Sequence, residues 1–233
     1  MPHRFPSVIA VTLLLCLLAV MQQGCEQKLV SQQETPKAKC TTDKSQSPEA
    51  RGFRLGMSLD QIQKRFSGLK VNDADEFGMT KIVLEGSKSV PSDRDVSTIY
   101  SDRILVNTSR FPEFMEVQVV ALGLMDNRVT SIDITYPDEP KWGAYDVFAA
   151  HVAKSFNLPD EKDWNHGQGM SSITCNGFDV WAGFRVRTIN RETADVRAYP
   201  FILIKDNDAD KMLEERKQAK REKEKEKLKD FKP

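Results

Sequence analysis

The strongest constraint on this chain lies at its N-terminus, where residues 7–21 (SVIAVTLLLCLLAVM) form an unbroken run of apolar and small residues. One charged residue, Arg4, precedes the run, and polar sequence follows it. The run is shorter than the roughly 20 residues that span a bilayer as a helix. A charged start, a short apolar core and a polar continuation are typical of a secretory signal peptide. We therefore expect residues 1–24 to direct export, so that the remainder matures outside the cytoplasm, in the periplasm or anchored to a membrane.

The end of this signal is ambiguous. Gly24-Cys25 resembles the end of a bacterial lipobox, in which a small residue precedes the cysteine that becomes lipidated. Gln22 and Gln23 depart from the aliphatic and small residues that normally stand there. Three outcomes stay open: lipidation of Cys25, which would tether the chain through buried acyl chains, simple cleavage nearby, or retention of the segment as an uncleaved anchor.

The cysteine count adds a second expectation. Of four cysteines, Cys16 leaves with the signal, and Cys25 is either lipidated or removed. The remaining two, Cys40 and Cys175, predict a disulfide in an exported chain, with two unpaired thiols as the alternative. No CxxC motif or Cys/His cluster occurs, which disfavours a zinc site and thioredoxin-type chemistry.

Charge and composition divide the chain further. The whole sequence carries 34 Lys+Arg and 34 Asp+Glu, and this balance disfavours a nucleic-acid-binding protein. Residues 25–50 are polar and predict a spacer. Residues 209–233 are rich in Lys and Glu and predict a charged helical tail. The tail is expected either to be a solvated helix or to contact anionic lipid, an envelope polymer or a partner.

Residues 51–208 predict an α+β body of short helices packed on an antiparallel sheet. Ser58 and Gln61 form a capping-box pattern that opens the first helix, and residues 143–157 have the apolar spacing of a second. Strands are expected at residues 115–122 and 129–136, with Met115, Val117 and Val119 facing inward in the first, and again at 171–175, 178–188 and 201–204. The helix–strand order can also be divided into two tandem halves, 51–140 and 141–208.

Catalytic patterns are scarce. His3 falls in the signal, and neither His151 nor His166 belongs to a recognised nucleophile, zinc or phosphate-loop motif. We expect no enzyme activity, no cofactor and no metal site. A hydrolase with an unrecognised site near His166 stays as an alternative, because nucleophilic catalysis in this chain would need a histidine of this kind.

The strand 178–188 offers an interaction surface. Its apolar side chains alternate with Asp179, Trp181, Gly183, Arg185 and Arg187. An indole flanked by arginines on one sheet face is typical of recognition surfaces. The structural alternative is an indole covered by a helix or stacked under an arginine. We take Trp181, Arg185 and Arg187 as the candidate interaction residues.

The segment RGFRLGMSLDQIQKRF (51–66) resembles the start of small envelope proteins, including the outer-membrane assembly lipoproteins of the SmpA/BamE type and the β-lactamase-inhibitor-protein-like (BLIP-like) fold. The whole body, with Trp142 opening its second helix, looks more like exported bacterial envelope proteins of unassigned activity. The resemblance implies helix pairs on antiparallel strands and assigns Gly56 and Met57 to packing and capping.

These patterns together predict a non-enzymatic exported binding or interaction protein of the bacterial cell envelope. Its partner would be a protein or another envelope component. An inhibitor or assembly factor for one specific protein is the alternative.

Overall fold

A computed structural model describes residues 38–87, 94–100, 103–137, 143–190 and 195–229. The expected signal peptide, Cys25 and Trp142 lie outside these residues. Residues from Lys37 onward form one compact unit. Within the described ranges, no helix has both the length and the apolar character needed to cross a membrane.

The helices and strands have bounds that the sequence patterns anticipate in part. The helical elements are the 3₁₀ turns η1 (Lys44–Gln46), η2 (Pro112–Phe114) and η4 (Glu161–Asp163) and the α-helices α2 (Leu59–Arg65), α3 (Tyr145–Ser155) and α4 (Asn207–Lys229). The strands are β1 (Met79–Ser87), β2 (Val96–Tyr100), β3 (Arg103–Asn107), β4 (Val119–Met125), β5 (Arg128–Thr135), β6 (Asn165–Gly167), β7 (Met170–Thr174), β8 (Phe178–Asn190) and β9 (Asp195–Asp206).

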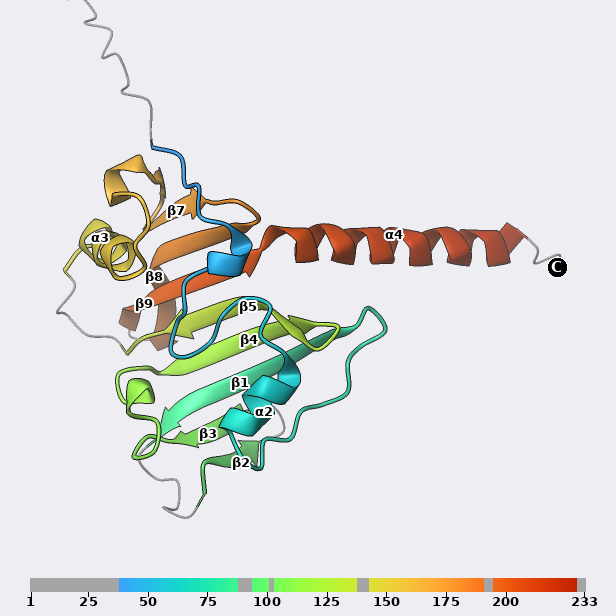
Figure 1. The fold of residues 1–233 in the computed structure, drawn as a ribbon, viewed down its shortest axis with the longest axis horizontal. Coiled ribbons are helices and arrows are strands. Elements are labelled where there is room, and N and C mark those ends of the chain that lie inside the picture. The colour runs from blue at the N-terminus through green and yellow to red at the C-terminus, as the bar shows by residue number, and fades with distance from the viewer. Residues whose placement is uncertain (1–37, 88–93, 101–102, 138–142, 191–194, 230–233) are drawn as a thin grey trace, which may run out of the picture. The chain divides into compact units, whose positions relative to one another are not determined.

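The strands form one nine-stranded sheet in the order β2-β3-β1-β4-β5-β9-β8-β7-β6 (Figure 1). The α+β class is therefore confirmed. The expectation of a purely antiparallel sheet is wrong, because β1 and β3 pair in parallel. Strand β2 lies between β1 and β3 in sequence and forms the edge of the sheet, where it pairs antiparallel with β3. Because β2 reverses the chain direction, β3 runs parallel to β1.

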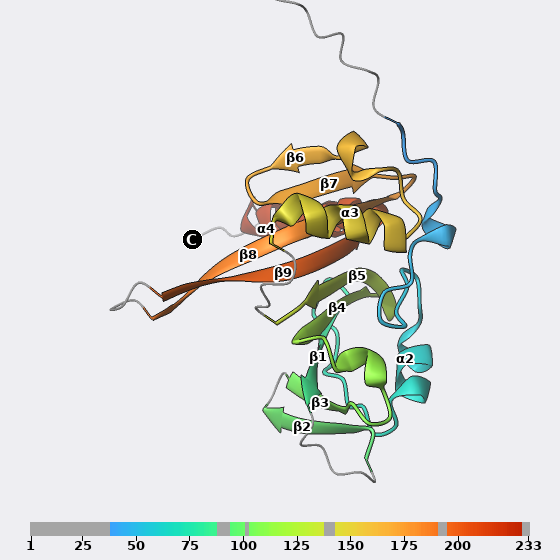
Figure 2. The ribbon, with the colours of Figure 1, turned by 90° about the vertical axis from the view of Figure 1, so that its left-hand side faces the viewer.

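Helices α2 and α3 cover the same face of this sheet (Figures 1 and 2). The apolar side chains on this face continue across the junction between β5 and β9, where Ile132 lies opposite Ile204 and Ile134 opposite Ile202. All four are at most 5% exposed. Removing such side chains from water is the main favourable term in folding, so this continuous apolar layer binds the two strand groups into one core.

Local sequence specifies α2. The Ser58 side chain accepts a hydrogen bond from the Gln61 backbone N–H, and the Gln61 side chain accepts one from the Ser58 N–H. The predicted capping box is therefore confirmed. Ile62 is fully buried and anchors the helix on the sheet. The helix ends at Arg65, and Gly68 supplies a positive φ of 83° in the turn that follows.

The register of β4 differs from the sequence expectation. Met115, Val117 and Val119 were expected to face inward. Val117 is buried as expected, but it precedes β4, which begins at Val119, and Met115 is 57% exposed. The buried side chains of β4 are Val120, Leu122, Leu124 and, at its end, Met125. Both alternating sets of residues in β4 lack polar side chains, so the sequence of β4 does not decide which set is buried. The pairing of Leu122 with Ile82 and Ile132 decides which set faces the helices.

Asp126 and Asn127 connect β4 to β5 and confirm the predicted hairpin turn. Both have positive φ, 49° and 61°. A two-residue turn with this geometry matches the right-handed twist of antiparallel strands, and Asp and Asn tolerate it better than most residues do.

The predicted Cys40–Cys175 disulfide is present. Around it, the second part of the segment expected to be a spacer packs on the body. Asp43 forms a bridge with Asn176, and Lys44 pairs with Asp206 at 3.1 Å and Asp208 at 2.6 Å. The packed part of the chain thus begins before residue 51.

Helix α4 follows β9 directly and confirms the predicted charged helix. Asp206 caps its start, because its carboxylate accepts hydrogen bonds from the backbone N–H groups of Asp208 and Ala209. Arg216 makes two hydrogen bonds to the Asp126 carboxylate, at 3.0 and 2.6 Å, and another to the Phe77 carbonyl. Lys220 contacts the Glu76 carboxylate at 2.6 Å. The first half of the helix is thus attached to its own body, while residues 221–227 are exposed.

We expect loss of the disulfide to destabilise the fold by about 2–5 kcal/mol, since it closes a loop of 135 residues. Urea denaturation of the Cys40→Ser/Cys175→Ser variant, compared with the oxidised protein, measures this difference. Reductant should lower the midpoint of the wild type only. Equal midpoints for the two proteins would contradict the expectation.

We expect α4 to detach from the β4–β5 turn in acid. Hydrogen bonds from Arg216 lower the pKa of Asp126. A carboxyl group whose pKa is lower in the folded than in the unfolded protein stabilises the fold at pH values above its unfolded-state pKa. This stabilisation is lost as the pH falls through the folded-state pKa, which for Asp126 lies below about 4. Spin labels at positions 73 and 223 should show a broader distance distribution at pH 3 than at pH 7. Asp126→Asn should show the broad distribution at both.

Candidate interaction face

The face of the sheet opposite α2 and α3, which we call the open face, carries a mixed set of polar, charged and aromatic side chains. Strand register places them in transverse rows. One row runs from Val83 through Ala121, Asp133 and Leu203 to Trp181. The next row runs from Glu85 through Val119, Thr135 and Phe201 to Gly183. The strand alternation expected for Trp181, Arg185 and Arg187 therefore places all three on this face.

Arg185 is held in place on the open face by contacts with two other strands. Its guanidinium donates to both Asp133 carboxylate oxygens, at 2.8 and 2.9 Å. It also lies 4.1 Å from the ring centroid of Phe201, which is 3% exposed beneath it. A bidentate ion pair combined with a cation–π contact holds the planar group in one orientation. Arg185 thus presents a defined charged surface while remaining partly exposed.

Trp181 and Arg187 flank this pair along β8. The stacking alternative for the indole assumed that an arginine would cover it, but the arginines of the strand lie over other rings. Arg185 lies over Phe201, and Arg187 lies 5.5 Å from the ring of Tyr199. Trp181 is partly exposed in the row that also holds Asp133. An indole, two oriented cations and a carboxylate therefore share one surface.

A hollow of about 740 Å³ lies on the open face beside these residues. Its charged lining consists of Lys81, Arg103, Arg185 and Arg187 on the basic side and Glu85 and Asp133 on the acidic side. Arg103 pairs with Glu85 at 2.7 Å, as Arg185 pairs with Asp133. Lys81 and Arg187 leave the hollow with a positive excess. Its size suits a segment of a partner protein or several side chains.

Gly183 makes close contact with a neighbouring strand possible on this face. A Cβ at this position would lie 2.4 Å from the Gly169 carbonyl oxygen and 2.6 Å from the Met170 Cα. Both are backbone atoms, which cannot move aside cheaply. The glycine between Trp181 and Arg185 therefore allows the start of β7 to lie against β8.

The candidate hydrolase site near His166 has different geometry from a catalytic triad. His166 Nδ1 lies 3.1 Å from the Ser171 hydroxyl and 3.2 Å from the Glu161 carboxylate. A triad needs the serine and the acid on opposite ring nitrogens, whereas here both contact the same one. Ser171 is fully buried and also donates to Glu161 at 3.2 Å. The cluster therefore serves to hold η4 against the β6–β7 hairpin and gives a substrate no access to the hydroxyl.

Asp133, Thr135 and Phe201 belong to the open face, although the sequence analysis did not single them out. The signal that could have found them is the same strand alternation: in TSIDITY the apolar Ile132 and Ile134 face inward, which turns Asp133 outward. What the alternation could not supply is that β9 lies between β5 and β8. That order brings Asp133 and Phe201 beneath Arg185.

Among the described residues, no group of three or more His, Cys, Asp or Glu side chains is arranged to hold a metal ion. The acidic sequence Asp206–Asp210 instead starts α4 and binds Lys44. Comparison of the chain with protein-family models, curated proteins and solved structures found no match.

We expect Gly183→Ala to destabilise the protein by about 1–3 kcal/mol, because the added methyl group would overlap backbone atoms of β7. Gly167→Ala is the matched control, since the nearest atom to a Cβ there is 3.8 Å away. Urea denaturation of both variants measures the difference. Equal midpoints would show that β7 does not lie this close to β8.

Proposed function

We propose that this chain is a non-enzymatic, exported binding protein of the bacterial cell envelope that holds a protein partner on the open face of its sheet. The observation that carries the proposal is the fixed position of Arg185. Its two hydrogen bonds to Asp133 and its contact with Phe201 orient it before any partner arrives. A side chain that is already ordered loses less conformational freedom on binding.

The composition of the open face also favours a protein partner. Tryptophan, tyrosine and arginine are enriched at the energetic centres of protein interfaces. Trp181, Arg185 and Arg187 lie on one strand, and Tyr199 lies under Arg187 on the next. The hollow is lined by paired and unpaired charges, including Arg185 and Arg187 of the strand that also carries Trp181. The open face thus offers both apolar contact and charge complementarity to a polypeptide.

Export outside the cytoplasm is supported by two independent features. The apolar run at residues 7–21 has the length and flanks of a secretory signal. The Cys40–Cys175 disulfide belongs to an oxidising compartment. Lipidation of Cys25 would add a membrane tether, and simple cleavage would leave the protein in the periplasm.

An inhibitor or assembly factor acting on one specific protein is the alternative form of the same proposal. The arrangement that favours it is that α2 and α3 both lie on one face of the nine-stranded sheet. The opposite face of the whole sheet is thereby left available to a single partner.

Photo-crosslinking tests the proposal directly. A photoreactive amino acid replacing Trp181 should yield a discrete crosslinked partner band from envelope extract, because this position lies on the open face. The same amino acid replacing Lys64, which is exposed on α2 on the opposite side of the sheet, is the matched control. Arg185→Ala should reduce the Trp181 crosslink about tenfold, as expected for an interface anchor. Equal bands from both positions, or no dependence on Arg185, would refute the open face as the binding surface.

A further inference from the structure

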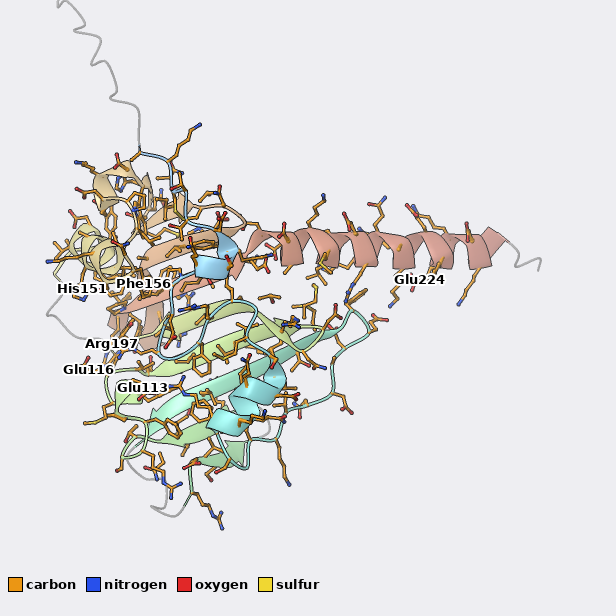
Figure 3. The ribbon with its side chains drawn as sticks, in the orientation of Figure 1. Glu113, Glu116, His151, Phe156, Arg197 and Glu224 are labelled. Atoms are coloured by element: carbon orange, nitrogen blue, oxygen red, sulfur yellow. A yellow bond between two sulfur atoms is a disulfide. The ribbon has the colours of Figure 1, made fainter. Side chains whose placement is uncertain are left out.

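A second cavity lies on the helix-covered side of the sheet. This cavity, which we call the seam pocket, has a volume of about 430 Å³. Its walls come from α3, from the end of β5 and the part of β9 paired with it, and from the segments around residues 50 and 113. In Figure 3, His151 of α3 and Phe156, which directly follows α3, lie on one side of this region, and Glu113 and Glu116 lie on the other.

The inner wall of the seam pocket is apolar. Ile134, Phe148, Val152 and Ile202 contribute to it and are at most 5% exposed. Tyr136 packs edge-on against Phe148 with ring centroids 5.9 Å apart. A pocket of this size with an apolar lining and few polar groups is typical of sites that accept an apolar side chain or a small ligand.

The rim of the seam pocket is acidic. Glu49, Glu113 and Glu116 line it, with Arg51 as the basic residue of the lining. Arg65 pairs with the Glu113 carboxylate, and Arg54 lies 3.8 Å from the Glu49 carboxylate. Glu116 is exposed at the mouth. An occupant that combines an apolar group with neighbouring cations therefore fits both the wall and the rim.

Arg51 gives independent support for a preformed pocket. Its φ is 53°, a left-handed conformation that residues with a side chain rarely adopt. Its guanidinium donates to the Glu113 carbonyl at 2.9 Å and lies 5.4 Å from the Tyr136 ring centroid. Sparsely populated backbone conformations persist where the surroundings fix them, and they cluster at binding sites. Here the strained residue connects two walls of the pocket.

The chain itself contains a segment with the required chemistry. Residues 227–232 read KLKDFK, so that Leu228 and Phe231 are the apolar residues among three lysines and one aspartate. They are three positions apart, which is the spacing of one helical face. Residues 221–233 carry six Lys or Arg and four Asp or Glu, a net charge opposite in sign to that of Glu116 at the mouth of the pocket.

This segment cannot reach the seam pocket of its own chain while α4 is attached. Arg216 and Lys220 hold α4 at the β4–β5 turn and the segment before β1, whereas the pocket lies at the opposite end of β5, beside Ile134 and Tyr136. From Lys220 the helix continues away from α3 (Figure 1). The occupant must therefore come from another molecule.

We propose that the seam pocket binds the C-terminal segment of a second copy of this chain, with Leu228 and Phe231 against the apolar wall and the flanking lysines beside Glu49 and Glu116. This self-association uses the face of the sheet opposite the open face. It goes beyond the binding function proposed above, and leaves the open face free for a different partner.

Titration of the purified, oxidised protein with a labelled peptide of residues 221–233 tests the site. Fluorescence anisotropy should report saturable binding. Replacing both Leu228 and Phe231 in the peptide with serine should weaken it at least about tenfold, because the apolar contact is lost. Undiminished binding of that peptide would overturn the proposal.

Two protein variants locate the peptide. Glu116→Lys reverses charge at the rim, and Ser155→Trp fills the mouth of the pocket from an exposed position on α3. Each should weaken binding several-fold. The matched controls, Asp73→Lys and Lys154→Trp, change exposed residues that do not line the pocket and should leave binding unchanged. Equal effects of the test and control variants would place the peptide elsewhere and refute the site.

Sedimentation velocity of the full chain completes the test. The wild type should self-associate with increasing concentration, and both Phe231→Ser and Glu116→Lys should shift it towards monomer. A wild type that stays monomeric at concentrations where the peptide saturates the protein would overturn the proposal, because the segment would not then act between copies. Loss of self-association with an intact Trp181 crosslink would separate this site from the open face.

Discussion

The pairing of β5 with β9 is the interaction on which the rest of the structure depends. Five residue pairs, from Ser131 with Lys205 to Thr135 with Phe201, join the strands β1–β5 to β6–β9 in one sheet. Without this ladder the apolar pairs Ile132–Ile204 and Ile134–Ile202 would have no common core. Long-range antiparallel pairing of this kind brings together segments about 70 residues apart in the chain, so it also decides which side chains can meet on either face.

The same ladder produces both sites. On one face it places Asp133 of β5 beside Phe201 of β9, and Arg185 of β8 binds them both. On the other face it places Ile134 beside Ile202, and these residues form part of the wall of the seam pocket. The two faces then differ in what covers them. Helices α2 and α3 cover the apolar face and leave a pocket between α3 and the segments around residues 50 and 113.

Several features could be predicted because their causes are local. The capping box at Ser58, the Asp126-Asn127 turn and the apolar stripe of α3 each depend on residues that are neighbours in sequence. The register of β4 could not be predicted this way, because both alternating sets of residues from Val119 to Met125 lack polar side chains. Only the neighbouring strands β1 and β5 select Leu122 over Ala121 as the buried side chain.

The sequence by itself determined the strand alternation that places Trp181, Arg185 and Arg187 together, the pairing of the last two cysteines and the helical charged tail. Each follows from a period, a count or a propensity within one segment. Tertiary structure alone decided that β9 lies between β5 and β8, that Phe201 rather than Trp181 lies beneath Arg185, and that Arg216 fixes the direction of α4. These features depend on contacts between residues far apart in the chain. The order of the strands in the sheet is the one that gives the whole core the lowest free energy.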